Sequence, residues 1–153
     1  MNNTLKILIT SAYLLLTTPV LAAPFTYSSD GSEVTDSNTG LIWRRCSTGQ
    51  AWSASTSTCR GTTARYTHQD ALGYAELEIG WRLPNVKELS SITDRSLSNP
   101  PIDPIAFPGT SNDFYWTSSP AGASGGNAWV VSFNDGYVSG HGRTNYYHVR
   151  LVR

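Results

Sequence analysis

The fold is decided by the stretch Trp81-Arg82-Leu83-Pro84-Asn85-Val86-Lys87-Glu88-Leu89, which predicts an extended segment that leads directly into a helix. Pro84 disfavours helical geometry at Leu83 and keeps that residue extended. Asn85 is a favourable N-cap, and Glu88 stands three positions later, where its side chain can bond back to the Asn85 amide. Apolar residues then recur at 86, 89 and 92 on one helical face. We expect a strand end, a capping box and a helix to about residue 94, with Arg82 and Glu88 in an ion pair or capping arrangement.

The chain before this stretch predicts one helix and one hairpin. Thr67 and Asp70 have the spacing of a capping box, and apolar residues at 71, 72 and 75 form the inner face of a helix that ends near Gly80. Segments 33–36 and 41–43 flank a polar turn and predict a hairpin, and residues 25–27 predict a first strand. Residues 44–65 are rich in Ser, Thr and Gly, which predicts a long loop.

The chain after the central helix predicts a proline-rich loop followed by antiparallel strands. Four prolines between residues 96 and 112 exclude regular structure there. Strands are expected at 114–116, 128–133, 137–138 and 146–153, and Asn134-Asp135-Gly136 is typical of a tight hairpin turn. In the last strand Tyr147, Val149 and Leu151 share one face, while His148, Arg150 and Arg153 point elsewhere.

The N-terminus has the features of a secretory signal peptide. Lys6 is followed by an apolar run over residues 7–16, which is too short to span a bilayer, and by the small-residue pattern that ends at Ala22. We expect one soluble, exported domain over residues 23–153, located in the periplasm, at the cell surface or in the medium. Without Lys6 it keeps 10 of the 11 Lys and Arg residues and all 11 Asp and Glu residues, a net charge of −1. Bulk charge therefore gives no reason to expect nucleic acid as a partner.

The two cysteines, Cys46 and Cys59, are 13 positions apart. In an oxidising compartment the simplest interpretation of such a pair is a disulfide. A metal site and a catalytic thiol are the alternatives, but neither cysteine has a CxxC neighbour or a nearby histidine. We therefore expect a structural bridge that holds the loop over residues 44–65.

Several motifs in order resemble one known family. They are Thr35-Asp36 with Thr39-Gly40-Leu41-Ile42-Trp43, the stretch at 81–89, Phe107-Pro108, Tyr115-Trp116-Thr117-Ser118-Ser119, Ala128-Trp129-Val130-Val131-Ser132-Phe133 and Val149-Arg150-Leu151-Val152-Arg153. Together they resemble the Lcl C-terminal domain family, named after the C-terminal domain of a bacterial collagen-like adhesin. That family is similar to the C-type-lectin-like superfamily, which includes the formylglycine-generating sulfatase-modifying enzymes.

The resemblance implies an α+β, C-type-lectin-like fold, with two helices flanking a small twisted antiparallel sheet and long loops on one side. In such folds the first and last strands are neighbours, so we expect residues 25–27 to pair with residues 149–152. Family members often carry a cysteine in the terminal motif, where this chain has Leu151. Both cysteines here are N-terminal, so the oxidase chemistry of the formylglycine-generating enzymes does not carry over.

The sequence offers weak signals for catalysis and for metal. His68, His141 and His148 are scattered, and no Gly-x-Ser-x-Gly elbow occurs. We therefore expect no enzymatic activity and no cofactor. Asn134 and Asp135 are candidate calcium ligands, but the Asn-Asp-Gly run is also ordinary turn chemistry, and calcium needs six to eight oxygen ligands.

The aromatic residues indicate ligand binding, because aromatic faces stack on sugars and are favoured at recognition surfaces. We assign Trp43, Trp81, Trp116 and Trp129 to the core, and Trp52 could pack on the bridge or face solvent. The predicted contact residues lie on the last hairpin and its turn: Tyr137, His141, Arg143, Asn145, Tyr146 and Tyr147.

These observations and the resemblance predict an exported bacterial binding module, adhesin-like, that recognises polysaccharide, glycosaminoglycan or a surface protein. One alternative is an enzyme or enzyme accessory related to the formylglycine-generating proteins. Another is an envelope structural subunit that binds its own kind. A deep pocket with converging acid and base groups would favour the enzyme. An open aromatic and polar surface on the last hairpins would favour the binder.

Overall fold

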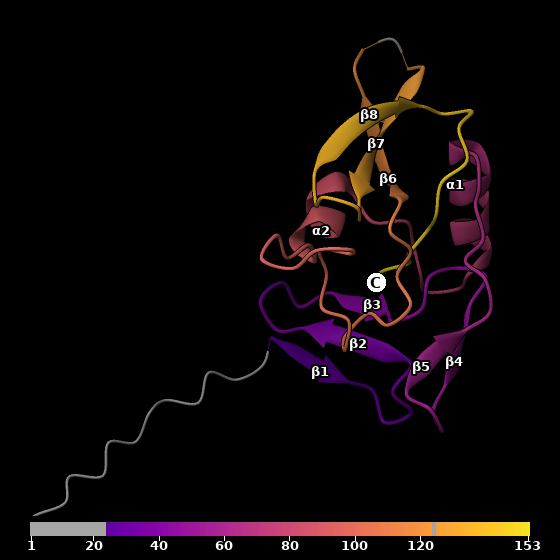
Figure 1. Ribbon diagram of the computed structural model, residues 1–153. Helices are drawn as coiled ribbons and strands as arrows, with labels where there is room; N and C mark the ends of the chain where they lie inside the picture. Colours follow the sequence, from indigo (N-terminus) through magenta and orange to yellow (C-terminus); the bar gives the residue numbers. More distant parts are fainter. Residues whose placement is uncertain (1–23, 124) are drawn as a thin grey trace, which may run out of the picture.

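The computed structural model describes residues 24–123 and 125–153, so the predicted signal peptide over residues 1–22 lies outside the described residues. Within them the fold is mixed α and β, with two helices and three small antiparallel sheets in place of the one sheet expected. In Figure 1 the two three-stranded sheets lie at opposite ends of the molecule, with the C-terminus between them. No helix in the described part of the chain is long and apolar enough to cross a membrane.

The first sheet contains the predicted N-terminal strand and hairpin. Its strands are antiparallel in the order β1-β2-β3, with bounds Phe25–Tyr27, Glu33–Asp36 and Ile42–Arg44. The Asp36 carboxylate closes the turn, since it accepts the Asn38 N–H at 2.9 Å and the Thr39 hydroxyl at 2.8 Å. A short polar side chain at this position satisfies turn amides that would otherwise need water. Both predictions are confirmed.

Residues 44–65 contain a second hairpin, so the prediction of a long loop was wrong for this segment. β4 (Ala51–Ser53) pairs antiparallel with β5 (Thr58–Arg60). Thr56 closes the turn. Its N–H donates to the Ser53 carbonyl at 3.3 Å, and its hydroxyl donates to the Ser53 hydroxyl oxygen at 2.9 Å. The hydroxyl side chains that indicated a loop thus build a turn. The predicted Cys46–Cys59 disulfide is confirmed and ties β5 to the segment after β3.

The first helix, α1 (His68–Leu77), begins at the predicted N-cap. The Thr67 hydroxyl oxygen accepts the Asp70 N–H at 3.2 Å and donates to the Asp70 carboxylate at 2.7 Å. Ala71 and Ala75 are buried on its inner face, as expected, and their small side chains let the helix pack closely on its neighbours.

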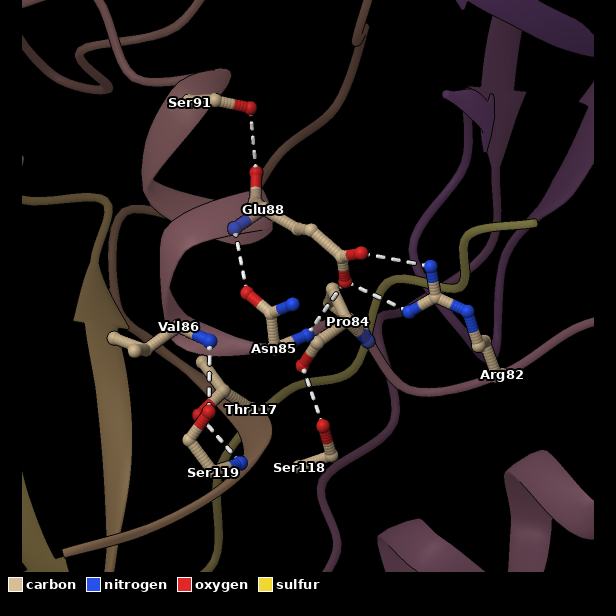
Figure 2. A network of polar contacts seen from close by, with 9 residues as sticks. All are labelled: Arg82, Pro84, Asn85, Val86, Glu88, Ser91, Thr117, Ser118 and Ser119. Atoms are coloured by element: carbon tan, nitrogen blue, oxygen red, sulfur yellow. Dashed lines mark hydrogen bonds and ion pairs between the residues drawn. The ribbon is translucent and has the colours of Figure 1, made fainter. Parts of the chain in front are cut away.

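The second helix, α2 (Val86–Ser91), follows the central stretch and carries the predicted capping box. The Asn85 side chain accepts the Glu88 N–H at 2.9 Å, and the Glu88 carboxylate accepts the Asn85 N–H at 2.8 Å (Figure 2). The same turn is held to the strand at 114–121, because the Ser118 N–H donates to the Pro84 carbonyl at 2.8 Å. The start of α2 is therefore fixed from two sides.

The last sheet has the antiparallel order β6-β7-β8, with bounds Phe114–Ala121, Asn127–Ser132 and Val138–Gly142. Gly136, at φ 77°, supplies the left-handed residue that the predicted turn between β7 and β8 requires. The loop before β6 is irregular, in agreement with its four prolines.

The C-terminal segment does not form the predicted continuous strand. It crosses the molecule and makes isolated antiparallel bridges from Val152 to Trp43 and Arg82, and further bridges at Tyr147 and His148. The expected pairing with residues 25–27 was wrong, because β1 lies at the far edge of its sheet and pairs with β2. The open edge of β3 receives the terminal segment instead.

The core consists of two clusters of buried side chains, one around Trp43 and one around Trp116. Val149 and Leu151, which the sequence placed on one face, are both fully buried. Trp81 and Trp129 are only half-buried, so their assignment to the core was correct only in part. Trp81 packs at the rim of the second cluster.

Arg150 and His148 are buried, which corrects the expectation that they point away from the core. Arg150 has no exposed surface, and His148 is 3% exposed. Burial lowers the pKa of Arg150 to about 10, so the guanidinium stays charged at neutral pH. Its donors bond to the carbonyls of Arg44 and Arg45 and to the hydroxyls of Ser47 and Thr110.

Two buried histidines give the folding stability a defined pH dependence. Burial lowers the pKa of His68 and of His148 below the ordinary value of 6.5. Below pH ~6.5 the unfolded chain therefore binds protons that the folded protein does not, and stability falls as pH falls, by up to about 1.4 kcal/mol per pH unit for each histidine. Denaturant melts between about pH 7.5 and 5 should show this loss, with stability complete above the window. Stability that stays constant or rises on acidification across this window would contradict the burial argument.

Candidate binding site

The central stretch holds Arg82 and Glu88 against each other. The two guanidinium nitrogens of Arg82 donate to the two Glu88 carboxylate oxygens at 2.7 and 2.8 Å (Figure 2). The hydrogen bond from Arg82 lowers the pKa of Glu88. The expected ion pair is confirmed, and both side chains are used in positioning α2. Arg82 also exchanges two backbone hydrogen bonds with Val152, at 2.9 and 3.0 Å, which fixes the neighbouring Trp81.

The Trp81 ring lies beside two arginines that are themselves paired with carboxylates. The guanidinium carbons of Arg44 and Arg153 lie 4.9 and 4.7 Å from the ring centre, within the range of cation–π attraction. Arg44 donates to Glu78 at 2.6 Å, and Arg153 donates to Glu33 at 2.6 Å. The hydrogen bonds from Tyr74 and Arg44 lower the pKa of Glu78. Both carboxylates are thus held in ion pairs with arginines.

A cleft of about 300 Å³ opens where β3, the β4–β5 hairpin and α1 meet. The hairpin and α1 lie on the same side of the molecule in Figure 1. The lining combines three aromatic side chains with polar groups: Thr48, Gln50, Trp52, Tyr74, Trp81 and Glu33. A concave site with aromatic walls and a few placed polar groups is the usual form of a small-ligand site.

The polar groups of the cleft differ in whether they are already bonded. The Gln50 side chain donates to the Gly109 carbonyl at 3.1 Å and accepts the Ser47 N–H at 3.3 Å. The Trp52 indole N–H donates to the Asp30 carbonyl at 2.9 Å. The Thr48 hydroxyl, on a residue that is 7% exposed, has no hydrogen-bond partner among the described residues. The Thr48 oxygen is itself buried, so it is not exposed to the cleft.

A second cavity of about 460 Å³ lies between α1 and the central stretch, and Trp81 separates it from the cleft. Its walls include Leu72, Glu88 and Ser118. Glu88 is engaged by Arg82 and Asn85, and the Ser118 hydroxyl donates to a carbonyl at 3.3 Å. The cleft has the better chemistry for recognition, because three aromatic side chains line it, whereas this cavity has Trp81 as its aromatic wall.

The structure separates the six contact residues predicted on the last hairpin. Tyr137 is 60% exposed and stacks on Arg95, whose guanidinium carbon lies 4.3 Å from the ring centre, at the turn before β8. Arg143, Asn145 and Tyr146 follow the other end of β8. The Arg143 side chain donates to the Asn127 carbonyl at 3.3 Å, and Tyr146 is 61% exposed. Tyr137 and these three residues therefore flank opposite ends of β8.

The side chains of His141 and Tyr147 lie together, but their polar atoms are already hydrogen-bonded within the protein. The two imidazole nitrogens of His141 bond to the Tyr147 hydroxyl at 2.6 Å and to the Ser139 hydroxyl at 3.0 Å. The Phe114 ring contacts both rings, with centre distances of 4.6 and 5.2 Å. This arrangement stabilises the β8 turn and leaves the polar atoms of His141 occupied.

The candidate calcium ligands Asn134 and Asp135 lie in the turn between β7 and β8. The Asp135 carboxylate accepts the Tyr137 N–H at 3.1 Å, which is ordinary turn chemistry. Across residues 24–123 and 125–153, no group of three or more His, Cys, Asp or Glu side chains lies close enough to hold a metal ion.

Sequence reasoning missed the cleft because its residues come from three separate elements. Trp52 was left open between two roles, and Trp81 was assigned to the core. Thr48 and Tyr74 carry no motif. A usable signal was the position of Trp52, which faces Cys59 across the β4–β5 hairpin and is therefore held by the disulfide.

The fold is that of a small domain with a cleft at the junction of its N-terminal sheet and first helix. The chain belongs to the Lcl C-terminal domain family, whose model matches residues 32–153. No curated protein matches the sequence. The family was the one that the order of motifs predicted.

Proposed function

We propose that the protein is an exported, non-enzymatic module that binds carbohydrate in the cleft between the β4–β5 hairpin and α1. The observation that carries the proposal is the lining of the cleft, where the aromatic side chains of Trp52, Tyr74 and Trp81 stand beside polar residues that include Glu33 and Gln50. Aromatic faces bind the C–H faces of sugar rings, and fixed polar groups select their hydroxyls. The cleft replaces the last hairpin as the expected contact surface.

A binding role is supported by the state of the groups that an enzyme would use. His68 and His148 are buried and have depressed pKa values, and both nitrogens of His141 are bonded to hydroxyls. Glu33 is held by an arginine. A general base must reach its substrate and be poised to take a proton, which none of these groups is arranged to do.

Export and a distant C-type-lectin-like relationship are further parts of the proposal. The leader pattern at residues 1–22 and the Cys46–Cys59 disulfide support an oxidising compartment. The terminal segment joins the N-terminal sheet at the open edge of β3, which supports a domain closed by its C-terminal residues, as in C-type-lectin-like proteins.

The proposal predicts that Trp52→Ala weakens glycan binding by about tenfold or more, because an aromatic wall contributes on the order of 1 to 2 kcal/mol to a sugar contact. The purified protein is screened on a glycan array with and without calcium, and the best ligand is then titrated by calorimetry. Thermal melts establish that the variant is folded.

Tyr146→Ala is the matched control, since Tyr146 is an exposed aromatic residue outside the cleft. Its affinity should stay within about twofold of the parent. If Tyr146→Ala abolishes binding and Trp52→Ala does not, the ligand contacts the last hairpin and the cleft assignment is wrong.

A further inference from the structure

We propose that the open edge of β8 binds an extended, acidic peptide segment of a partner protein as an additional strand. This surface shares no lining residue with the cleft, so the inference does not depend on carbohydrate binding. Three features carry it: unpaired backbone groups along the edge, a groove between β8 and α2, and cations that no carboxylate neutralises.

The hydrogen-bond pattern shows which backbone groups of β8 face outward. The Ser132 N–H donates to the Tyr137 carbonyl at 2.8 Å, so these two residues are a hydrogen-bonded pair at the start of the β7–β8 ladder. Such pairs alternate with non-hydrogen-bonded pairs along an antiparallel ladder. The N–H and C=O groups of Val138 and Gly140 therefore point away from β7, and none of the four has a hydrogen-bond partner among the described residues.

The C-terminal segment covers the comparable edges of β3 and β6 and leaves β8 open. The Arg44 N–H donates to the Leu151 carbonyl at 3.1 Å, and the Trp116 N–H donates to the His148 carbonyl at 2.9 Å. In the described part of the chain β8 remains the outer strand of its sheet, with five residues and without lysine or proline. Lysine and proline are common devices that keep an edge from pairing with another chain. The glycine at position 140 is typical of places where a second backbone approaches closely.

A groove of about 400 Å³ lies beside the start of this edge, between β8 and α2 (Figure 1). It is lined by Val86, Lys87, Ser90, Ser91 and Val138, and Val138 is 41% exposed. Side chains alternate between the two faces of a strand, so every second side chain of an added strand would point toward α2. The edge would then supply the affinity through backbone hydrogen bonds, and the groove would select the side chains.

The charges around the groove favour an acidic partner. Lys87 lines the groove, Arg143 follows the other end of β8, and neither is in an ion pair among the described residues. The carboxylates on α2 and in the turn before β8, Glu88 and Asp135, each already face an arginine. An acidic segment is therefore attracted to this surface, and a basic segment is repelled.

The test is an NMR titration of the ¹⁵N-labelled protein with three synthetic peptides: acetyl-(Glu-Val)₃-amide, its lysine counterpart, and the acidic peptide with N-methylated amides. The acidic peptide should shift the amides of residues 86–91 and 138–142 and slow the solvent exchange of the Val138 and Gly140 amide protons. N-methylation removes its backbone donors and should weaken binding by about tenfold or more. The lysine peptide should bind at least about threefold more weakly, and salt should weaken the acidic peptide.

Two substitutions test the edge and the groove separately. Val138→Pro removes one outward N–H, which a strand edge tolerates, and should weaken binding of the acidic peptide by about fivefold. Lys87→Glu should weaken it by about threefold or more. Arg60→Glu is the matched control, because it makes the same change in net charge at an exposed residue of β5, and its affinity should stay within about twofold of the parent. If Val138→Pro fails to fold, the N-methylated peptide tests the backbone pairing.

Several outcomes would overturn the proposal. Equal binding of the N-methylated peptide would show that no strand is added, and a preference for the lysine peptide would show that the partner is not acidic. If the β8 amides respond to protein concentration and to no peptide, the edge pairs with a second copy of this chain instead. Shifts confined to the cleft would place the peptide elsewhere. Glycan binding is followed separately at the indole resonances of Trp52 and Trp81, so failure of one proposal leaves the other in place.

Discussion

A chain that ends at His148 is expected to be unfolded at room temperature. The missing residues include Val149, Leu151 and Val152, which are fully buried and contact both core clusters. Six backbone hydrogen bonds to β3, Thr48 and Arg82 are lost with them. Burial of three such side chains contributes about 1.5 to 3 kcal/mol each, which together is comparable to the whole stability of a typical domain.

Circular dichroism and thermal melts of the truncated chain provide the measurement. A chain that ends at Val152 is the matched control, since it keeps the three buried side chains and four of the six hydrogen bonds. It loses Arg153, whose side chain is 43% exposed where it pairs with Glu33. Exposed ion pairs contribute about 0 to 1 kcal/mol, so the control should remain folded. A chain ending at His148 that unfolds cooperatively at the parent temperature would show that the terminal segment is not part of the core.

Arg150→Ala is expected to reduce the free energy of unfolding by about 3 to 5 kcal/mol. The guanidinium is fully buried and bonds to the carbonyls of Arg44 and Arg45, so its loss leaves these acceptors without a partner. It also leaves a cavity beside Phe107, whose ring centre lies 4.9 Å from the guanidinium carbon. The substitution also removes the free-energy cost of burying a charged group, but this gain is smaller than the two losses.

Urea denaturation of Arg150→Ala and Arg143→Ala, measured side by side, tests this prediction. Arg143 is half-buried and its side chain makes one hydrogen bond, to the Asn127 carbonyl at 3.3 Å. Its removal should change the stability by about 1 kcal/mol or less. Equal losses from the two substitutions would contradict the assignment of Arg150 as the link between the N-terminal sheet and the core.

The elements that could be predicted are those specified by local chemistry. The capping box at Asn85, the N-cap at Thr67 and the Asp36 turn each depend on residues within a few positions, and the structure contains all three. The β4–β5 hairpin was missed because its Ser and Thr residues favour turns and loops alike. The partner of the terminal segment was predicted wrongly because the pairing of two segments that are far apart in the sequence does not depend on the residues next to either one. The alternation of apolar and polar residues in the last segment likewise could not show that Arg150 is buried, because its hydrogen-bond acceptors include a backbone carbonyl of a strand far away in the sequence.

The candidate site was harder to predict than the fold. Polar and aromatic residues on the last hairpin were close in sequence, but the structure turns Tyr137 toward Arg95 and closes His141 against Tyr147. The cleft brings Thr48, Trp52 and Trp81 together from separate segments, and only the packing of the β4–β5 hairpin beside α1 makes them neighbours. Family membership predicts the fold of the domain. It does not by itself say which residues bind a ligand.

The most direct test of carbohydrate binding in the cleft is a crystal structure of the protein with the oligosaccharide that binds best on the glycan array. We expect a sugar ring in the cleft, packed against Trp52 or Trp81. A sugar bound on the Asn145–Tyr146 turn, with the cleft free of ligand, would contradict it.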